Sequence, residues 1–308
     1  MRRTTSFVAA LGVSVLALSG CGLSGDALES GGGGNCDDAK PKDGPIKIGS
    51  ADFPESSLIA EVYAGALKAK GVQVSTTDPI GAREAYLKAL SDGSVQIVPE
   101  YTNSLLTFLD KDAKAKGPDE IYAALLTTIP CDELALQKSA AEDSNAMVVP
   151  KSVADKWQLK TISDLAKHAN EVTIAAPAEF RTREQGLLGL KSTYNLTPKS
   201  FRPLGNPQAI STALKNGQAQ AANIFSTDPS ITTNGFVVLK DDKALFGSDN
   251  VIPLIAKKAA TPKVQVALNA VSAKLTTTNL AQMLKEVVVD KKSAKTVAAA
   301  FLKANGLA

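Results

Sequence analysis

Two aromatic residues occupy equivalent places in a short internal repeat. The segments 89–93 and 213–217 share the pattern Ala-Leu-x-x-Gly, and twelve residues after each alanine come Tyr101 and Phe225. Residues that suit a helix N-cap follow both rings, beginning with Thr102 and Ser226. Each unit therefore places a ring beside free backbone N–H groups, at the point where a predicted strand ends and a helix begins.

The elements around this repeat alternate between short apolar runs and longer amphipathic ones. The pattern predicts strands at 46–49, 72–74, 95–98, 172–175, near 201 and at 219–225. It predicts helices at 55–70, 82–92, 184–193 and 207–216, and purely helical structure from Pro262 onward. This alternation is typical of an α/β fold with parallel sheets flanked by helices. Ligands of such sheets bind at the carboxyl ends of the strands, so two facing edges would form a cleft.

The first twenty residues have the features of a secretory signal. Met1-Arg2-Arg3 precedes an apolar stretch from Phe7 to Leu18, which is short for a membrane span. Leu18-Ser19-Gly20-Cys21 resembles the lipobox of bacterial lipoproteins, and that resemblance implies a lipid anchor on Cys21. The alternative is an ordinary signal peptide with an incidental cysteine. We expect an exported protein on the outer side of the cytoplasmic membrane, with residues 21–44 as a flexible tether.

Net charge and cysteine content limit the partners, covalent links and cofactors that the sequence indicates. Removing residues 1–20 leaves 32 Lys and Arg against 31 Asp and Glu, and this balance does not indicate a nucleic-acid partner. Cys36 and Cys131 then form an even pair, which in an oxidising compartment predicts a disulfide, two unpaired thiols being the alternative. One histidine with no cysteine near it does not predict a metal site, and nothing indicates a cofactor.

The order of several short motifs resembles the glycine betaine/choline/carnitine-binding lipoproteins of osmoprotectant ABC importers. The motifs are Gly81-Ala82-Arg83, Gly93 through Val98-Pro99-Glu100-Tyr101-Thr102, Asp143-Ser144-Asn145-Ala146, Thr161-Ile162-Ser163-Asp164-Leu165, Arg183-Glu184-Gln185-Gly186-Leu187, Gly189-Leu190-Lys191 and Phe225-Ser226-Thr227-Asp228. The resemblance covers most of residues 45–308. It implies a two-lobed periplasmic-binding-protein fold with two hinge crossings and a ligand cleft between the lobes. We expect lobe 1 at 45–143 plus 245–308 and lobe 2 at 147–240.

The resemblance also implies roles for individual residues. Tyr101 matches a tyrosine of the aromatic cage that holds a quaternary ammonium, and Asp143 matches an acidic residue near it. Ser104 and Arg183 match the positions that hold the ligand's carboxylate. Arg181 competes for the arginine role because it lies within the same turn.

Other positions depart from the family pattern. Asn145, Phe225 and Asp249 stand where the family has further cage tyrosines, and Ala51, followed by Asp52 and Phe53, stands where a lysine is common. Such a depleted cage predicts a ligand that is more polar or larger than a simple betaine.

Two other classes of function, an enzyme and an envelope protein without a transport role, are alternatives to a binding protein. An enzyme is not indicated, since the sequence contains no Gly-x-Ser-x-Gly, phosphate loop or paired His/Cys arrangement. An envelope solute sensor or interaction lipoprotein without a transport role remains an alternative. The resemblance itself implies a monomeric solute-binding protein that delivers its ligand to an ABC permease and its ATPase.

Overall fold

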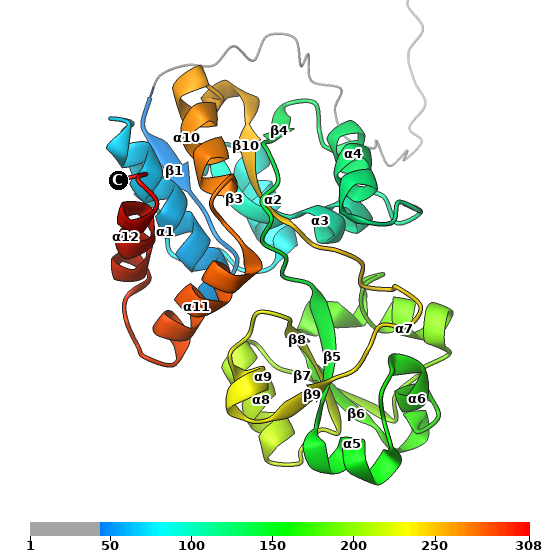
Figure 1. Ribbon diagram of the computed structural model, residues 1–308. Coiled ribbons are helices and arrows are strands. Elements are labelled where there is room, and N and C mark those ends of the chain that lie inside the picture. The colour runs from blue at the N-terminus through cyan, green and yellow to red at the C-terminus, as the bar shows by residue number, and fades with distance from the viewer. Residues whose placement is uncertain (1–43) are drawn as a thin grey trace, which may run out of the picture. The chain divides into compact units, whose positions relative to one another are not determined.

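The computed structural model describes residues 44–308. Cys21, Cys36 and the predicted tether up to residue 43 lie outside the described residues, so the lipid anchor and the Cys36–Cys131 pairing stay predictions. The described chain folds into two α/β lobes, each built on a five-stranded mixed sheet (Figure 1).

The first lobe contains both ends of the described chain. Its strands are β1 (Ile46–Ile48), β2 (Val74–Thr76), β3 (Ile97–Tyr101), β4 (Glu133–Ala135) and β10 (Val251–Ala256), in the order β2-β1-β3-β10-β4. Its helices are α1 (Pro54–Ala69), α2 (Arg83–Ser91), α3 (Thr102–Leu109), α4 (Pro118–Thr128), α10 (Pro262–Ser272), α11 (Thr277–Val288) and α12 (Ala294–Ala304), with the short 3-10 helix η4 (Lys257–Ala259). Strands β1, β2 and β3 run parallel, whereas β10 pairs antiparallel with β3 and β4.

The second lobe repeats this arrangement. Its strands are β5 (Asn145–Pro150), β6 (Thr173–Ala176), β7 (Ser200–Pro203), β8 (Ala221–Phe225) and β9 (Phe236–Val238), in the order β7-β6-β8-β5-β9. Its helices are α5 (Lys151–Trp157), α6 (Ile162–Ala166), α7 (Leu187–Tyr194), α8 (Pro207–Lys215) and α9 (Ser230–Thr233), with the 3-10 helices η2 (Ala169–Glu171) and η3 (Ala178–Arg181). Here β5 pairs antiparallel with β8 and β9.

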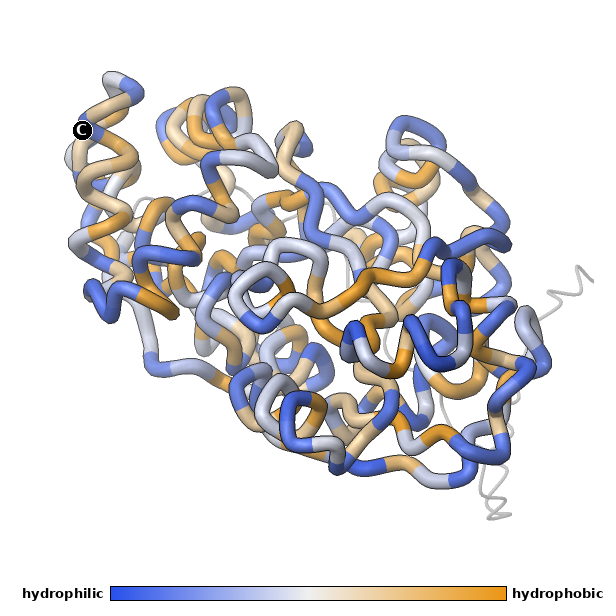
Figure 2. Tube along the Cα trace, turned by 60° about the horizontal axis from the view of Figure 1, so that its bottom comes forward, coloured by the Kyte–Doolittle hydropathy of each residue, from blue (hydrophilic) through white to orange (hydrophobic). Residues whose placement is uncertain are grey.

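Each lobe has apolar clusters on both faces of its sheet. In the first lobe, α1 buries Leu58, Ile59 and Val62 against the C-terminal helices, which contribute Val271 and Leu302. In the second lobe, Ile174 and Leu190 belong to one cluster, while the opposite face packs under α8. Figure 2 shows hydrophobic and hydrophilic residues alternating along the chain, with hydrophilic residues frequent on the outer turns. Burial on both faces explains why β10, all of whose residues are buried, is a continuous apolar run.

Two segments connect the lobes, one before β5 and one before β10. They run side by side, since Asp143 N donates to Asp249 O at 3.0 Å and Glu142 bridges to Asn250. Gly247 adopts a positive φ of 63° and lies against the Asn103 amide, a place where a side chain would collide. Leu245 and Phe246 pack with the second-lobe core, although their numbers fall within the range predicted for lobe 1.

Most predicted elements are confirmed, with shifts at their ends. The helices predicted at 55–70, 82–92 and 207–216 are α1, α2 and α8, and the region after Pro262 is helical as predicted. The strand predicted at 72–74 is β2 at 74–76, and the helix predicted at 184–193 begins only at Leu187. The α/β fold with sheets flanked by helices is confirmed, and the sheets predicted as parallel are mixed, because the strand that follows each crossing runs antiparallel to its neighbours.

Candidate ligand-binding site

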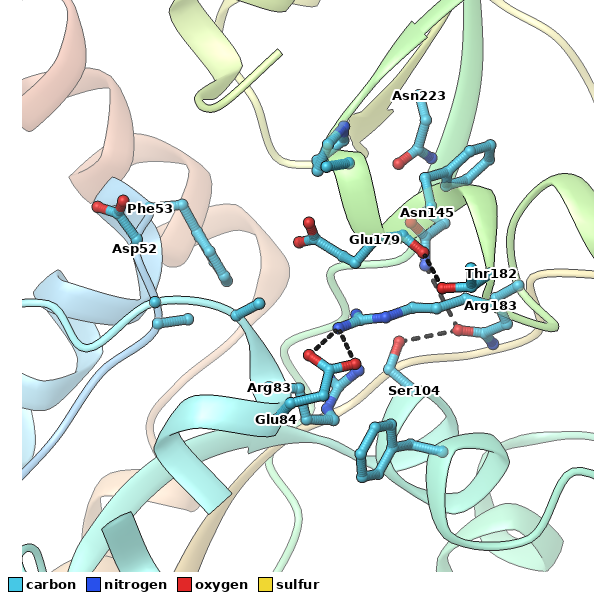
Figure 3. Close-up of a pocket in the computed structure, with 18 of the residues that line it drawn as sticks. Asp52, Phe53, Arg83, Glu84, Ser104, Asn145, Glu179, Thr182, Arg183 and Asn223 are labelled. Carbon is cyan, nitrogen blue, oxygen red and sulfur yellow. Dashed lines mark hydrogen bonds and ion pairs between the residues drawn. The ribbon is translucent and has the colours of Figure 1, made fainter. Parts of the chain in front are cut away.

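A cavity of about 580 Å³ lies where the two lobes face each other. Its walls include five residues predicted for the site, namely Tyr101, Ser104, Asn145, Arg183 and Phe225. Figure 3 shows three of them, Ser104, Asn145 and Arg183. Tyr101 ends β3 and Phe225 ends β8, where Phe225 is in register with Asn145 on β5. The sheet topology thus brings the carboxyl ends of the two repeat strands, β3 and β8, to one cleft. This is the location expected for ligands of open α/β sheets.

Three rings gather in this cleft. Phe53 stacks on Phe225 with a centroid separation of 5.2 Å, and Tyr101 lies 6.2 Å from Phe53 and 6.4 Å from Phe225. Phe53 and Phe225 are half-buried, whereas Tyr101 is buried. Phe53 was not predicted as a site residue. The sequence did contain a signal for Phe53. It lies between strand β1 and helix α1, and Tyr101 and Phe225 likewise lie where a strand ends and the chain continues toward a helix.

A buried acidic cluster lies behind Tyr101, between the lobes. The Tyr101 hydroxyl donates to Glu55 Oε1 at 2.8 Å, and Thr227 Oγ1 lies 2.5 Å from Glu55 Oε2 and 2.8 Å from Asp143 Oδ1. Burial raises the pKa of Glu55, and burial together with the neighbouring Glu55 raises the pKa of Asp143. Asp143 lines a second cavity of about 410 Å³, for which Phe53 and Phe225 also form part of the wall.

Ser104 and Asp249 form a polar group at the start of α3. Asp249 accepts hydrogen bonds from the backbone of Asn103 at 2.8 Å and of Ser104 at 2.9 Å, and so caps this helix from another segment. Ser104 Oγ lies 2.5 Å from Asp249 Oδ2 and 2.9 Å from Gln185 Oε1. Burial raises the pKa of Asp249 to about 6. Asp249 lies beneath Ser104 and lines neither of the two cavities described for residues 44–308.

Gln185 is a second residue that sequence reasoning missed. It is buried, donates to Phe246 O at 2.8 Å and lies within 3.4 Å of the Asn145 amide. Because Gln185 comes from lobe 2 and Ser104 from lobe 1, their contact joins the lobes across the cleft. A glutamine two residues after Arg183 carries no sequence signal for this role, which depends on the long-range approach of the two lobes.

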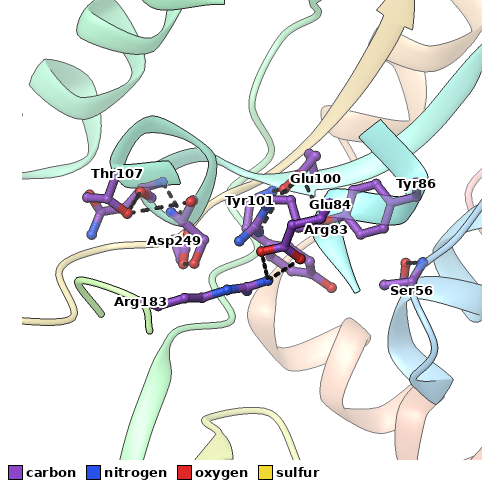
Figure 4. A network of polar contacts seen from close by, with 12 residues as sticks. Ser56, Arg83, Glu84, Tyr86, Glu100, Tyr101, Thr107, Arg183 and Asp249 are labelled. Atoms are coloured by element: carbon purple, nitrogen blue, oxygen red, sulfur yellow. Dashed lines mark hydrogen bonds and ion pairs between the residues drawn. The ribbon is translucent and has the colours of Figure 1, made fainter. Parts of the chain in front are cut away.

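Two arginines line the cleft, and they differ in how completely their guanidinium groups are paired. Arg83 is buried and held by Glu100 through two hydrogen bonds, Nε to Oε1 at 2.8 Å and Nη2 to Oε2 at 3.0 Å (Figure 4). Tyr86 donates to the same carboxylate at 2.8 Å. Arg183 reaches across from lobe 2 and contacts Glu84, with Nη2 3.2 Å from Oε1 and 3.1 Å from Oε2. Its Nε is buried and has no hydrogen-bond partner within residues 44–308.

Within residues 44–308 no group of His, Cys, Asp and Glu side chains is arranged to hold a metal ion. No helix in that same part of the chain is long and apolar enough to cross a membrane.

Two α/β lobes, two crossing segments and a cleft with rings from both sides define a solute-binding protein of the two-lobed periplasmic type. The family model for the substrate-binding domain of ABC-type glycine betaine transport systems matches residues 44–304. The chain therefore belongs to this family, and it is a substrate-binding protein of an ABC importer and not an enzyme. Proteins of this kind are exported and work with a permease and its ATPase.

Individual relatives agree with this assignment. The chain is 27% identical over 301 residues to the carnitine transport binding protein OpuCC of Listeria monocytogenes, covering 95% of this chain and 93% of the relative. It is 28% identical over 275 residues to the ergothioneine transport permease/ergothioneine binding protein EgtU of Helicobacter pylori, covering 85% of this chain and 48% of that protein. The crystal structure of a glycine betaine/carnitine/choline ABC transporter protein shares the fold, with a TM-score of 0.67, 24% identity and coverage of 85% and 99% of the two chains.

Proposed function

We propose that the cleft binds a zwitterionic quaternary ammonium compound, with the cation against Phe53, Tyr101 and Phe225 and the carboxylate at Arg183. The observation that carries this proposal is the group of three rings at the meeting edges of the two sheets, with centroids 5.2–6.4 Å apart. A quaternary ammonium has no hydrogen to donate, so ring faces are the groups that attract it.

The surroundings of the rings support a cation there. Glu55 and Asp143 lie behind Tyr101, and Asp52 lines the same cavity wall as Phe53. These acidic groups lie beside the rings, whereas Arg183 lies on the Glu84 side of the cleft. Because burial raises the pKa of Glu55 and Asp143, these two groups contribute carboxyl oxygens and not two full negative charges, and with Arg183 opposite them they suit a ligand with a positive end and a negative end.

Cavity size and amide groups favour a ligand larger or more polar than the simplest betaine. The volume of about 580 Å³ falls in the range of pockets that enclose drug-sized molecules. Asn145, Gln185 and Asn223 provide amide donors and acceptors on its walls. Carnitine and ergothioneine, named for two relatives, are the first compounds to test alongside glycine betaine and choline.

The remaining parts of the proposal concern the location and state of the protein. Lipid on Cys21 would hold a monomeric binding protein beside its permease, and a disulfide between Cys36 and Cys131 would fasten the tether to lobe 1. Ligand that contacts both lobes would stabilise the arrangement that the permease recognises, to the extent of its differential affinity for that state. An envelope solute sensor with the same cleft is the alternative.

Calorimetric titration of the purified protein tests the ligand class. The panel is glycine betaine, choline, carnitine and ergothioneine, with sorbitol as an uncharged polar control. We expect saturable one-to-one binding of at least one quaternary ammonium compound and none of sorbitol. Binding of the polyol without binding of any quaternary ammonium compound would refute the proposal.

A further inference from the structure

Glu84 and Arg183 form an ion pair that crosses the ligand cleft. Glu84 is the second residue of α2 in lobe 1, and Arg183 follows η3 in lobe 2. Both side chains line the 580 Å³ cavity, and Figure 4 shows the guanidinium of Arg183 directed at the Glu84 carboxylate. The pair therefore lies in the space that a ligand bridging the lobes would enter.

The pair uses only part of the Arg183 guanidinium. Both Glu84 oxygens contact the single nitrogen Nη2, at 3.2 and 3.1 Å. Nε is buried and has no hydrogen-bond partner within the described residues. A carboxylate satisfies a guanidinium best when its two oxygens accept from two different nitrogens. The Nε–Nη2 edge is thus suited to a better carboxylate partner than Glu84 in its present position.

The second arginine of the cleft does not offer Glu84 another partner. Arg83 already forms the two-pronged contact with Glu100, at 2.8 and 3.0 Å, and both of these side chains are buried. Glu84 itself is 54% exposed, so it can leave Arg183 for water at little cost.

We propose that Glu84 is a built-in competitor for the carboxylate site and thereby determines selectivity among quaternary ammonium ligands. A ligand with a carboxylate displaces Glu84 from Arg183, whereas a carboxylate-free cation binds with the Glu84–Arg183 pair intact. This inference rests on the proposed function. It makes Glu84 a specificity-determining residue that lowers the preference for zwitterions over simple cations.

The test compares Glu84→Gln with the matched control Glu179→Gln. Glu179 lines the same cavity and loses the same charge on substitution, but it forms no ion pair among the described residues. The measurement is the ratio of the dissociation constants of carnitine and choline, determined by calorimetry. We expect Glu84→Gln to tighten carnitine relative to choline by about two- to fivefold, the range for an exposed ion pair, and Glu179→Gln to leave the ratio unchanged.

A double variant separates competition from a general change of charge. With Arg183→Gln already present, adding Glu84→Gln should leave the carnitine-to-choline ratio as it is, because there is no guanidinium to release. An unchanged ratio in Glu84→Gln alone, or a shift of the same size in Glu179→Gln, would overturn the inference while the proposed function stands. Failure of the unsubstituted protein to bind either compound would instead refute the proposed function, and the inference with it.

Discussion

Phe53, Tyr101 and Phe225 reach the cleft by the same local rule. Tyr101 and Phe225 are the last residues of β3 and β8, and Phe53 lies between the end of β1 and the start of α1, so each ring lies at the carboxyl edge of its sheet. Their centroids lie within 6.4 Å of one another. At such a spacing the rings contact one another and leave faces and edges to the cavity, so each contributes part of one binding surface.

Removal of a ring should weaken cation binding. We predict that Phe53→Ala and Phe225→Ala each raise the dissociation constant of the best quaternary ammonium ligand by about tenfold, because a desolvated cation–π contact is worth up to about 2 kcal/mol. Phe201→Ala is the control, since Phe201 is also half-buried but packs in the second-lobe core. Calorimetry gives the affinities and thermal unfolding verifies the fold. Equal losses in all three variants would indicate a general loss of structure.

The two neighbouring arginines offer a second residue-level test. Arg183 lines the cavity, whereas the Arg181 guanidinium lies 5.1 Å from the Phe201 ring. We predict that Arg183→Ala weakens a carboxylate-bearing ligand by about tenfold or more, as expected for a hydrogen-bonded charge, and that Arg181→Ala has little effect. Titration of carnitine into both variants distinguishes them. The opposite order would assign the carboxylate to Arg181.

Among the elements, helix α12 stabilises lobe 1 and contributes no residue to the walls of the two cavities described above. Leu302 of α12 is 3% exposed and packs in the cluster that includes α1. We predict that Leu302→Ala lowers the free energy of unfolding by about 2–5 kcal/mol through the cavity it leaves. Leu126→Ala on α4, where the side chain is 42% exposed, should change it by less than about 0.5 kcal/mol. Denaturant unfolding measures both, and ligand affinity at low temperature should stay unchanged.

Elements with a clear apolar period were predictable from the sequence, and elements defined by pairing were not. Helices α1 and α8 were placed within one residue because Pro54 and Pro207 mark their starts and their apolar stripes are regular. Strand β2 was shifted by two residues since Val72 is as apolar as Val74. Strands β5 and β10 were not among the predicted strands, and their antiparallel direction was not predicted, because a continuous apolar run does not reveal its direction in a sheet.

The same limit applies to the site. Tyr101 and Phe225 were found through a local repeat, and Arg183 through family resemblance. Gln185, Glu55 and the capping role of Asp249 arise from contacts between distant segments, such as Asp249 with Ser104 across 145 positions. Local sequence patterns contain no information on such approaches. The predicted cage position of Asp249 remains untested, and in this structure its side chain caps α3.

At the scale of the whole molecule, buried carboxyl groups make the free energy of unfolding depend on pH. Burial raises the pKa of Asp249 to about 6 and of Glu133 to about 7, and it also raises the pKa of Glu55 and Asp143 between the lobes. The folded state therefore holds protons that the unfolded chain has released above about pH 4–5. Stability from these neutral forms is fully present below the unfolded pKa and is lost as pH rises through the folded values.

We therefore predict that the melting temperature falls as pH is raised from 5 to 8. Asp249→Asn should make this fall shallower between pH 5 and 6.5, because the substituted amide does not ionise. Acids with a lowered pKa, such as the half-buried Asp164, titrate at lower pH and therefore do not oppose the fall between pH 5 and 8. Differential scanning calorimetry at constant ionic strength measures the slope. A melting temperature that rises across this window would show that these acids are ionised in the folded protein.

The charge of the ligand head group provides the most direct test of the proposed site. The measurement compares the best quaternary ammonium ligand with its neutral carbon isostere, in which a tert-butyl group replaces the trimethylammonium. Shape and apolar area are nearly the same, so the difference isolates attraction of the cation to Phe53, Tyr101, Phe225 and the carboxyl oxygens beside them. The proposed site predicts at least tenfold weaker binding of the isostere. Equal binding of the two compounds would contradict a site that recognises a cation.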